Sequence, residues 1–490
     1  MSLVVKGGIQ HMIQLKKMVP KVHYYNQDFV DIYVRSWNML DDYWMKGTEA
    51  NNLEPQYFSW PAAEKINQLE ACYSTFYLVY SNRQYPAHTG LDNFYRKQEQ
   101  NGAIRGEYDI KTGEAVLGPN NPEGILPPLF AWAEYTLYHK VGMKKRIKDI
   151  LPVLQKYHSW LDKVAFDEEV GLYHVPLAAT GMPSIAREKA YYPIDFNCQQ
   201  ALSALYLSFL GDILNDKEIA YQYKRRYFML KTKINSLMWD EETHFYYDLD
   251  KSCTRLTVKT LAAYWSILAE IVSQENLEPL LGYLKDPQFF GTPNPFPTVA
   301  VSEASFGEGG LGFNGAVYPE LTFMVIKALE KYDVWDLARE KAISHLYFIL
   351  DTFHPESGTK GSFWQAYLPM KDGAAQAPEQ TDVPENKSDY IVYTSLATIT
   401  LMVENVVGMI ISLPRKTVDW IVPTLELMGI ESLSLKRNTI SIIATKTQRG
   451  AWELRMESEK LYYFTGHLLG VKKKTLPIPS GRCSMFLDKL

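Results

Sequence analysis

Two kinds of helical pattern alternate along most of this 490-residue chain, and this alternation limits the possible folds more than any other feature. Segments 127–133 and 201–207 are apolar on nearly every side, which is typical of helices enclosed by other helices. Segment 217–226 instead carries a charged face, as a helix at the surface does. We therefore expect inner and outer helices to follow one another along the chain.

The pattern predicts helices from about residue 27 to residue 408, of which the even-numbered ones are the apolar ones. The expected ranges are 27–45, 61–82, 86–99, 125–142, 145–163, 193–212, 215–237, 257–271, 276–285, 315–331, 333–350 and 387–408. Proline is tolerated in a first helical turn, and Pro61, Pro127 and Pro193 are expected at inner-helix starts. Inner–outer pairs of this kind predict a mainly α fold, an (α/α)6 toroid of six helical hairpins.

The period of the pattern changes after residue 414. Residues 439–445, 452–456 and 483–487 alternate between apolar and polar, which predicts short strands. We expect three parts, namely an N-terminal extension (1–26), an (α/α)6 barrel (27–410) and a small β-rich C-terminal domain (411–490). The extension is expected either to add a strand to the β-rich domain or to be disordered.

Composition narrows the classes of partner. A net charge of −5 with interspersed signs gives no reason to expect nucleic acid or an anionic membrane as a partner. The 33 Tyr and 11 Trp fit carbohydrate binding, although a large core also explains most of them.

The four cysteines lack metal-ligand spacing, and we expect no metal and no cofactor. The acidic stretch 241–251 lacks EF-hand spacing and is predicted to be a hairpin turn that carries solvated acids, Asp248 among them. Residues 1–6 do not resemble a secretion signal, but a trimmed N-terminus would look the same, so the compartment stays undetermined. The oligomeric state also stays undetermined.

Residues 361–369 form the stretch that points most directly to a function. Trp364 and Tyr367 flank Gln365 in a loop that leads to an apolar helix, an arrangement that suits a sugar platform. A hydrolase would need a carboxylate where Gln365 stands. We expect all three side chains to contact a carbohydrate.

Other candidates lie in the long segments before the inner helices, because such loops in a compact domain are usually functional. The further predicted substrate-binding residues are Trp60, Glu70, Glu123, Arg187, Tyr192 and Asn314. Some of these residues have a structural alternative. An acid in the first turn of a helix is favoured by the helix dipole, which suits Glu64, whereas Glu70 is expected too far along the same helix for that role. Arg187 is alternatively expected to pair only with Glu188.

The order of these motifs resembles the six-hairpin glycosidases of the trehalase-like and mannosylglycerate-hydrolase-like kind, related to glycoside hydrolase family 63. The resemblance covers residues 25–410 and rests on several segments in the same order. They are Leu91 to Gln98, Pro127 to Tyr135, Thr180 to Arg187, Gln199 to Ser208, Trp239 to Asp250, Asn314 to Glu330, Phe363 to Pro369 and Asp389 to Gly408. A trailing β segment is also usual in that group.

The resemblance implies inverting hydrolysis by two carboxyl groups, one acting as acid and the other activating water. The family acid is the Asp of a Gly-Met-Asp-Asn-x-Pro-Arg loop, and this position falls on Pro183. The family base is the Glu of a Trp-Glu-Asn-Tyr loop, and this position falls on Gln365. Neither proline nor an amide can perform these steps. The family Trp-Asp near the first inner helix likewise becomes Leu69-Glu70.

Three hypotheses follow. The first is an exo-glycosidase with a relocated pair of carboxylates, in which Glu188 replaces the acid and Glu320 is the leading candidate for the base, with Glu70, Asp382 and Glu385 as alternatives. The second is an inactive carbohydrate-binding homologue. The third is a six-hairpin lyase or epimerase, which ranks last because no pair of histidines suggests a base.

Overall fold

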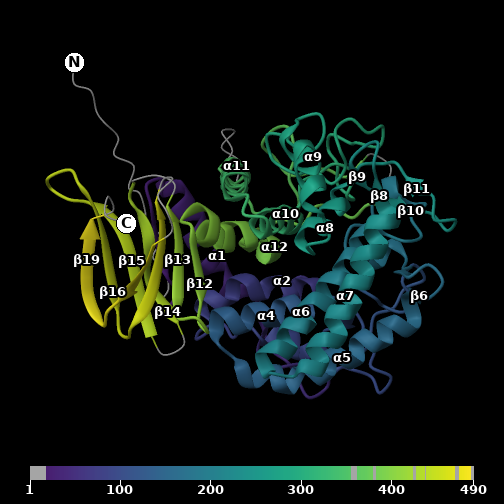
Figure 1. The fold of residues 1–490 in the computed structure, drawn as a ribbon, viewed down its shortest axis with the longest axis horizontal. Coiled ribbons are helices and arrows are strands. Elements are labelled where there is room, and N and C mark those ends of the chain that lie inside the picture. Colours follow the sequence, from purple (N-terminus) through teal and green to yellow (C-terminus); the bar gives the residue numbers. More distant parts are fainter. Residues whose placement is uncertain are drawn as a thin grey trace.

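The computed structural model describes residues 18–354, 361–378, 382–422, 426–435, 438–468 and 474–486. Residues 1–17 of the expected extension and residue 487 of the expected last strand lie outside these ranges. Twelve α-helices in the described part are followed by a region of strands, and the two regions pack side by side (Figure 1). Each described helix is too short or too polar to cross a membrane.

The apolar helices form a series in which each member contacts the next, and α12 and η6 return to contact α2. They are α2 (Gln68–Leu78), α4 (Phe130–Val141), α6 (Ile194–Leu214), α8 (Trp265–Leu268), α10 (Pro319–Lys331) and α12 (Ile391–Ser395), which continues as the π-helix η6 (Leu396–Val406). Nearly every residue of α2, α6, α10 and η6 is buried, as their all-round apolar pattern predicts.

The remaining helices bury only part of their surface. They are α1 (Gln27–Met39), α3 (Thr89–Arg96), α5 (Lys144–Ala165), α7 (Lys217–Met238), α9 (Gln274–Lys285) and α11 (Trp335–Phe353). In α7 the residues Ala220, Tyr223, Tyr227, Leu230, Ile234 and Met238 are buried, and their spacing of three or four marks one face. Charged residues cover the other side of α7, as expected of an outer helix.

Two inner helices are shorter than expected. The predicted helix 257–271 is a 3₁₀ turn at Leu261–Tyr264 followed by the four residues of α8. The predicted helix 61–82 begins only at Gln68, because β4 (Lys65–Asn67) pairs with β5 (Glu107–Asp109) just before it. Pro61 and Glu64 therefore do not start this helix. Asn67 caps it by accepting from the Leu69 and Glu70 N–H groups, which places Glu70 in the first turn.

Apart from two-stranded pairs such as β4–β5, the described strands form two larger sheets. One has the order β1-β14-β15-β16-β19 and is entirely antiparallel, whereas the other has the order β12-β13-β17-β18 with a parallel β13–β17 pair. The strands are β1 (Lys21–Tyr24), β12 (Met409–Ser412), β13 (Thr417–Val422), β14 (Met428–Leu435), β15 (Asn438–Lys446), β16 (Trp452–Ser458), β17 (Tyr462–Leu468), β18 (Lys474–Ile478) and β19 (Gly481–Phe486). The segment before α1 thus adds β1 to the edge of a sheet.

A buried ion cluster joins inner helices near their C-terminal ends. The carboxylate of Glu404 lies 2.7 Å from the Nζ of Lys140 and 2.7 Å from the Nζ of Lys327, and the Tyr80 hydroxyl donates to it. Burial alone would raise the pKa of Glu404, but the two ammonium groups outweigh burial and lower it. The cluster joins the 3₁₀ turn η2 (Val79–Ser81), α4, α10 and η6.

Glu404→Ala is expected to lower the free energy of unfolding by about 3–5 kcal/mol, because removal of one partner leaves buried charge uncompensated. Chemical denaturation at neutral pH measures the change. The exposed Glu168, changed to Ala, serves as the control and is expected to stay within about 0.5 kcal/mol of the wild type. Equal losses in both variants would contradict the role given to the cluster.

Candidate functional site

Two buried carboxyl groups lie near the N-terminal ends of inner helices. Glu70 lies in the first turn of α2 and Glu320 in the first turn of α10, where the helix dipole favours acidic side chains. Their side chains interact electrostatically, and the charge of Glu70 adds to the pKa of Glu320. The sequence prediction that Glu70 lies beyond the first turn was wrong.

Glu320 is a protonated acid at neutral pH. Burial, aided by the charge of Glu70, raises its pKa to about 8, while its own backbone N–H and Lys387 act in the opposite direction. Within the described residues its Oε2 atom is buried without a hydrogen-bond partner. A buried unsatisfied polar atom costs about 1–3 kcal/mol, so its retention needs an explanation.

Glu70 has a more polar environment than Glu320. The Tyr390 hydroxyl donates to its Oε1 atom at 2.8 Å, and the Nζ of Lys387 lies 4.0 Å from the same oxygen. Burial raises the pKa of Glu70, whereas Lys387 and the Tyr390 hydrogen bond favour its ionised form. A negative charge on Glu70 is therefore stabilised by a hydrogen bond and a nearby ammonium group, whereas the Oε2 atom of Glu320 has no hydrogen-bond partner among the described residues.

Aromatic rings surround the carboxyl pair. Lys387 lies over the rings of Trp60 and Tyr390, with its Nζ 4.6 Å and 4.9 Å from their centroids. The ring of Tyr73 in α2 meets Phe323 of α10 at 6.3 Å and Tyr393 of α12 at 5.6 Å. The rings bring three inner helices together around the acids.

The loop 361–369 is tied to the segment that carries Lys387. The Gln365 N–H donates to the Lys387 carbonyl at 3.0 Å, and the Thr394 hydroxyl donates to the Trp364 carbonyl at 2.9 Å. The Trp364 N–H donates to the Tyr367 hydroxyl, which is fully buried. Trp364 and Gln365 stay partly exposed and available to a ligand, whereas Tyr367 supports the loop from within.

Arg187 is a structural residue, in contrast to its predicted contact with substrate. Its Nε and Nη2 donate to Asp248 at 2.8 Å, its Nη1 and Nη2 donate to Asp195 at 2.7 Å, and Nη1 also donates to the Met182 carbonyl at 3.1 Å. These bonds use all five donors of the guanidinium. Arg187 therefore fixes the loop 182–188, and it does not pair with Glu188.

The other candidates divide between this loop region and the periphery. Asn314 accepts from the Ser184 hydroxyl at 2.9 Å and so joins two loops. Tyr192 is buried and donates to Asp167 at 2.7 Å, which leaves its hydroxyl turned toward protein. Glu188 is exposed, as is Glu123, which pairs with Arg105 at 3.0 Å. The structure thus gathers Trp60, Glu70 and Glu320, with the partly exposed Trp364 and Gln365 on an adjoining loop.

Within the described residues no group of His, Cys, Asp and Glu side chains could hold a metal ion. In the stretch 241–251 the strands β8 (Trp239–Asp240) and β9 (Phe245–Tyr246) form the expected hairpin. Asp248, which was expected to be solvated, is buried against Arg187.

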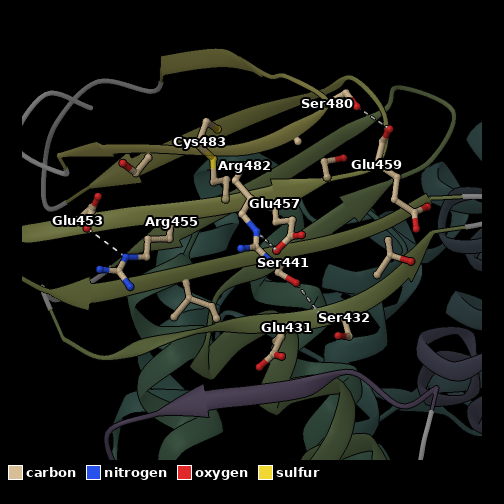
Figure 2. Close-up of a pocket in the computed structure, with 16 residues that line it drawn as sticks. Glu431, Ser432, Ser441, Glu453, Arg455, Glu457, Glu459, Ser480, Arg482 and Cys483 are labelled. Atoms are coloured by element: carbon tan, nitrogen blue, oxygen red, sulfur yellow. Dashed lines mark hydrogen bonds and ion pairs between the residues drawn. The ribbon is translucent and has the colours of Figure 1, made fainter.

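A separate concavity of about 1000 Å³ lies over one face of the five-stranded sheet (Figure 2). Its charged side chains largely pair with each other, as Arg455 does with Glu453 at 3.2 Å and Arg482 with Glu457 at 3.1 Å. The described residues that line it include no aromatic ring. This face therefore lacks the platform that a sugar site requires.

Comparison with known proteins identifies the family. The family described as the mannosylglycerate hydrolase MGH1-like glycoside hydrolase domain matches residues 83–381, and the trehalase C-terminal domain matches residues 408–490. This chain belongs to the MGH1-like glycoside hydrolases. An uncharacterized protein of Borreliella burgdorferi is 49% identical to it over 477 residues, which is 97% of this chain and 100% of that protein.

Solved structures share the fold of this MGH1-like chain at low sequence identity. The GH63 mannosylglycerate hydrolase of Thermus thermophilus is 16% identical with a TM-score of 0.58, covering 75% of this chain and 99% of that one. The GH78 family rhamnosidase of Bacillus sp. GL1 is 14% identical with a TM-score of 0.65, covering 91% of this chain and 42% of that one. The neutral trehalase of Saccharomyces cerevisiae is 12% identical with a TM-score of 0.53, covering 71% and 73%.

Glu320→Gln is expected to stabilise this MGH1-like protein above pH 4.5, and increasingly so up to about pH 8. The folded state holds the Glu320 proton up to that pH, whereas an unfolded glutamate has lost it above pH 4.5. The wild type should therefore lose about 1.4 kcal/mol of stability per pH unit in this window from Glu320 alone. The glutamine side chain of the variant does not titrate, so it adds no pH dependence to the free energy of unfolding.

Denaturation curves at pH 5, 6, 7 and 8 measure the difference between the two proteins. Glu168→Gln, which changes an exposed glutamate in the same way, serves as the control and is expected to show a constant difference. A Glu320→Gln difference that does not change with pH would contradict the raised pKa.

Proposed function

We propose that this chain hydrolyses a glycoside at the Glu70–Glu320 pair, at the mouth of an (α/α)6 toroid. The observation that carries the proposal is the buried Glu320 carboxyl, which keeps its proton at neutral pH and has an oxygen without a protein partner. The sequential contacts of the inner helices, closed by α12 and α2, support the toroid. The family supports the reaction class.

Glu320 acts as the general acid in this proposal. A catalytic acid needs a pKa near or above the working pH, and burial provides it. The unpartnered oxygen is free to donate to the glycosidic oxygen of a bound substrate. This assignment differs from the one expected from the sequence, in which Glu188 is the acid and Glu320 the base. Glu188 is exposed to solvent, whereas Glu320 is buried.

Glu70 acts as the base that activates water. Burial raises the pKa of Glu70, and Lys387 and the Tyr390 hydroxyl oppose this by stabilising its ionised form, which is the form that a base requires. A carboxylate beside a protonated carboxyl is the arrangement that glycoside hydrolysis requires. An inverting mechanism places the two groups roughly 6.5–9.5 Å apart, with room for the water.

A pyranoside is the substrate class that the site suits. Trp60 and Trp364 provide partly exposed flat rings, and Gln365 provides an amide that can bond to hydroxyl groups. The related mannosylglycerate hydrolase has been crystallised with glucose, and with Tris and D-glycerate. We infer that a hexose occupies the space beside Glu70 and Glu320.

Glu320→Gln is expected to reduce kcat about 10²–10⁴-fold on alkyl glycosides, because their leaving groups need a proton. Dinitrophenyl glycosides leave without protonation, so the same variant should hydrolyse them at nearly the wild-type rate. Glu70→Gln should lose turnover on both substrates. Wild-type kcat on alkyl glycosides is expected to fall above about pH 8, as Glu320 ionises.

Initial rates on both substrate types over a range of sugars measure these effects. Glu188→Gln is the matched control and is expected to retain wild-type rates. Equal losses of Glu320→Gln on the two leaving groups would remove the acid assignment. A loss in Glu188→Gln instead would restore the assignment that the sequence suggested.

Carbohydrate binding without turnover is the second candidate. It is favoured by Pro183 and Gln365, which occupy the positions of the acid and the base in the glycosidases that this chain resembles. In that case calorimetry detects sugar binding to a wild type that hydrolyses nothing. The double variant Pro183→Asp, Gln365→Glu is then expected to gain turnover on the sugar that binds. Wild-type turnover excludes this candidate.

A further inference from the structure

Two cavities adjoin the turn between α4 and α5, where the helical part meets the strands. The first, of about 900 Å³, lies between this turn, the end of η2 (Val79–Ser81) and Ser434 of β14. The second, of about 610 Å³, lies between the same turn, residues 413–416 and Tyr462 of β17. Gly142 and Lys144 line both, so the two cavities are neighbours.

Cations dominate the lining of these cavities. The basic lining residues are Arg83, Lys140, Lys144, Lys145, Arg146, Lys416 and Lys460. Asp92 and Asp149 line the first cavity, and the described lining of the second includes no carboxylate. Because the whole chain carries a net charge of −5, this accumulation is local and opposite in sign to the protein.

Two of these cations pair with carboxylates of the protein. Lys140 pairs with Glu404 at 2.7 Å, and Arg146 pairs with Glu134 and Asp92, each at 2.7 Å. By contrast, the ion pairs of the described residues include none with Lys144, Lys145, Lys416 or Lys460. Like charges around one hollow repel each other, and an anion in the hollow removes that repulsion.

The start of α5 adds to the same field. Lys144 and Lys145 are the first residues of this 22-residue helix, its first turn has no acid, and Met143 provides no side-chain cap. A helix N-terminus is positive and normally carries acidic side chains, so lysines there oppose the dipole. Both the lysines and the positive end of the helix dipole favour a bound anion.

We propose that these adjoining cavities bind a small ligand with several negative charges, of the phosphate class, at the seam between helices and strands. Lysine ammonium groups and a helix N-terminus are the usual partners of phosphate oxygens. The cavity volumes suit a small molecule rather than a membrane or a nucleic-acid duplex, which would need a broad convex or grooved face. Such a ligand would contact both regions of the protein and hold them together.

Calorimetry with sodium tripolyphosphate, ATP and glucose 6-phosphate at low ionic strength tests the proposal on the full chain. We expect tripolyphosphate to bind one site, to raise the melting temperature, and to bind more weakly as salt increases. Lys144→Glu with Lys416→Glu is expected to weaken binding at least about tenfold. Equal binding of ATP and tripolyphosphate identifies the phosphate chain as the ligand, whereas tighter ATP binding identifies a nucleotide.

Lys148→Glu with Lys156→Glu is the matched control, since it makes the same total charge change further along α5, outside either cavity lining. It is expected to bind tripolyphosphate as the wild type does. The proposal is overturned if the wild type binds none of the three ligands, or if the control and the double variant lose equal affinity. It is also overturned if only duplex DNA or anionic vesicles bind. Glycosidase assays are independent of these outcomes, because the lysines lie apart from Glu70 and Glu320.

Discussion

The contact between α2 and the segment entering α12 is the interaction on which the candidate site depends. It joins Glu70 to Tyr390 across a sequence separation of 320 residues, through a hydrogen bond of 2.8 Å. The same approach brings Lys387 to Glu70 and Trp60. Without that contact, Glu70 would be an isolated acid near a helix start and Glu320 another. With it, both acids are buried, and the charge of Glu70 adds to the effect of burial in raising the pKa of Glu320.

The arrangement of helices could be read from the sequence because burial imposes a simple pattern. An enclosed helix such as α6 must be apolar on all sides, and a surface helix such as α7 must keep a charged face. The same reasoning failed at the start of α2, where the pairing of two strands, rather than burial, sets the helix boundary. Residues 65–67 form a strand with 107–109, and that partner lies forty residues away in a loop with no periodic signal. The start of α2 and the position of Glu70 in its first turn could not be foreseen for this reason.

The site was less predictable than the fold, because its electrostatics depend on partners that are distant in sequence. Arg187 precedes Tyr191 and Tyr192 in its loop and was predicted to contact a ligand, but two buried aspartates and the Met182 carbonyl use its guanidinium completely. Asp248 was assigned to a solvated turn, and no local pattern indicates its partner 61 residues earlier. Lys387 stands in the polar run Glu385-Asn386-Lys387-Ser388-Asp389, which resembles a linker. Only the fold shows that it faces the carboxyl pair.

The burial of Glu320 is the strongest reason to treat this site as chemically active. A carboxyl group held neutral in an apolar space lowers stability at neutral pH relative to a neutral side chain of the same shape, as the linkage of its pKa to folding requires. A purely structural position would be filled equally well by glutamine or an apolar residue, without that loss. A sugar-binding position would more often keep an ionised carboxylate, which accepts two strong hydrogen bonds from hydroxyl groups. A protonated carboxyl with an unoccupied oxygen is suited to giving up a proton, and the neighbouring Glu70, with Lys387 and Tyr390 beside it, is suited to taking one.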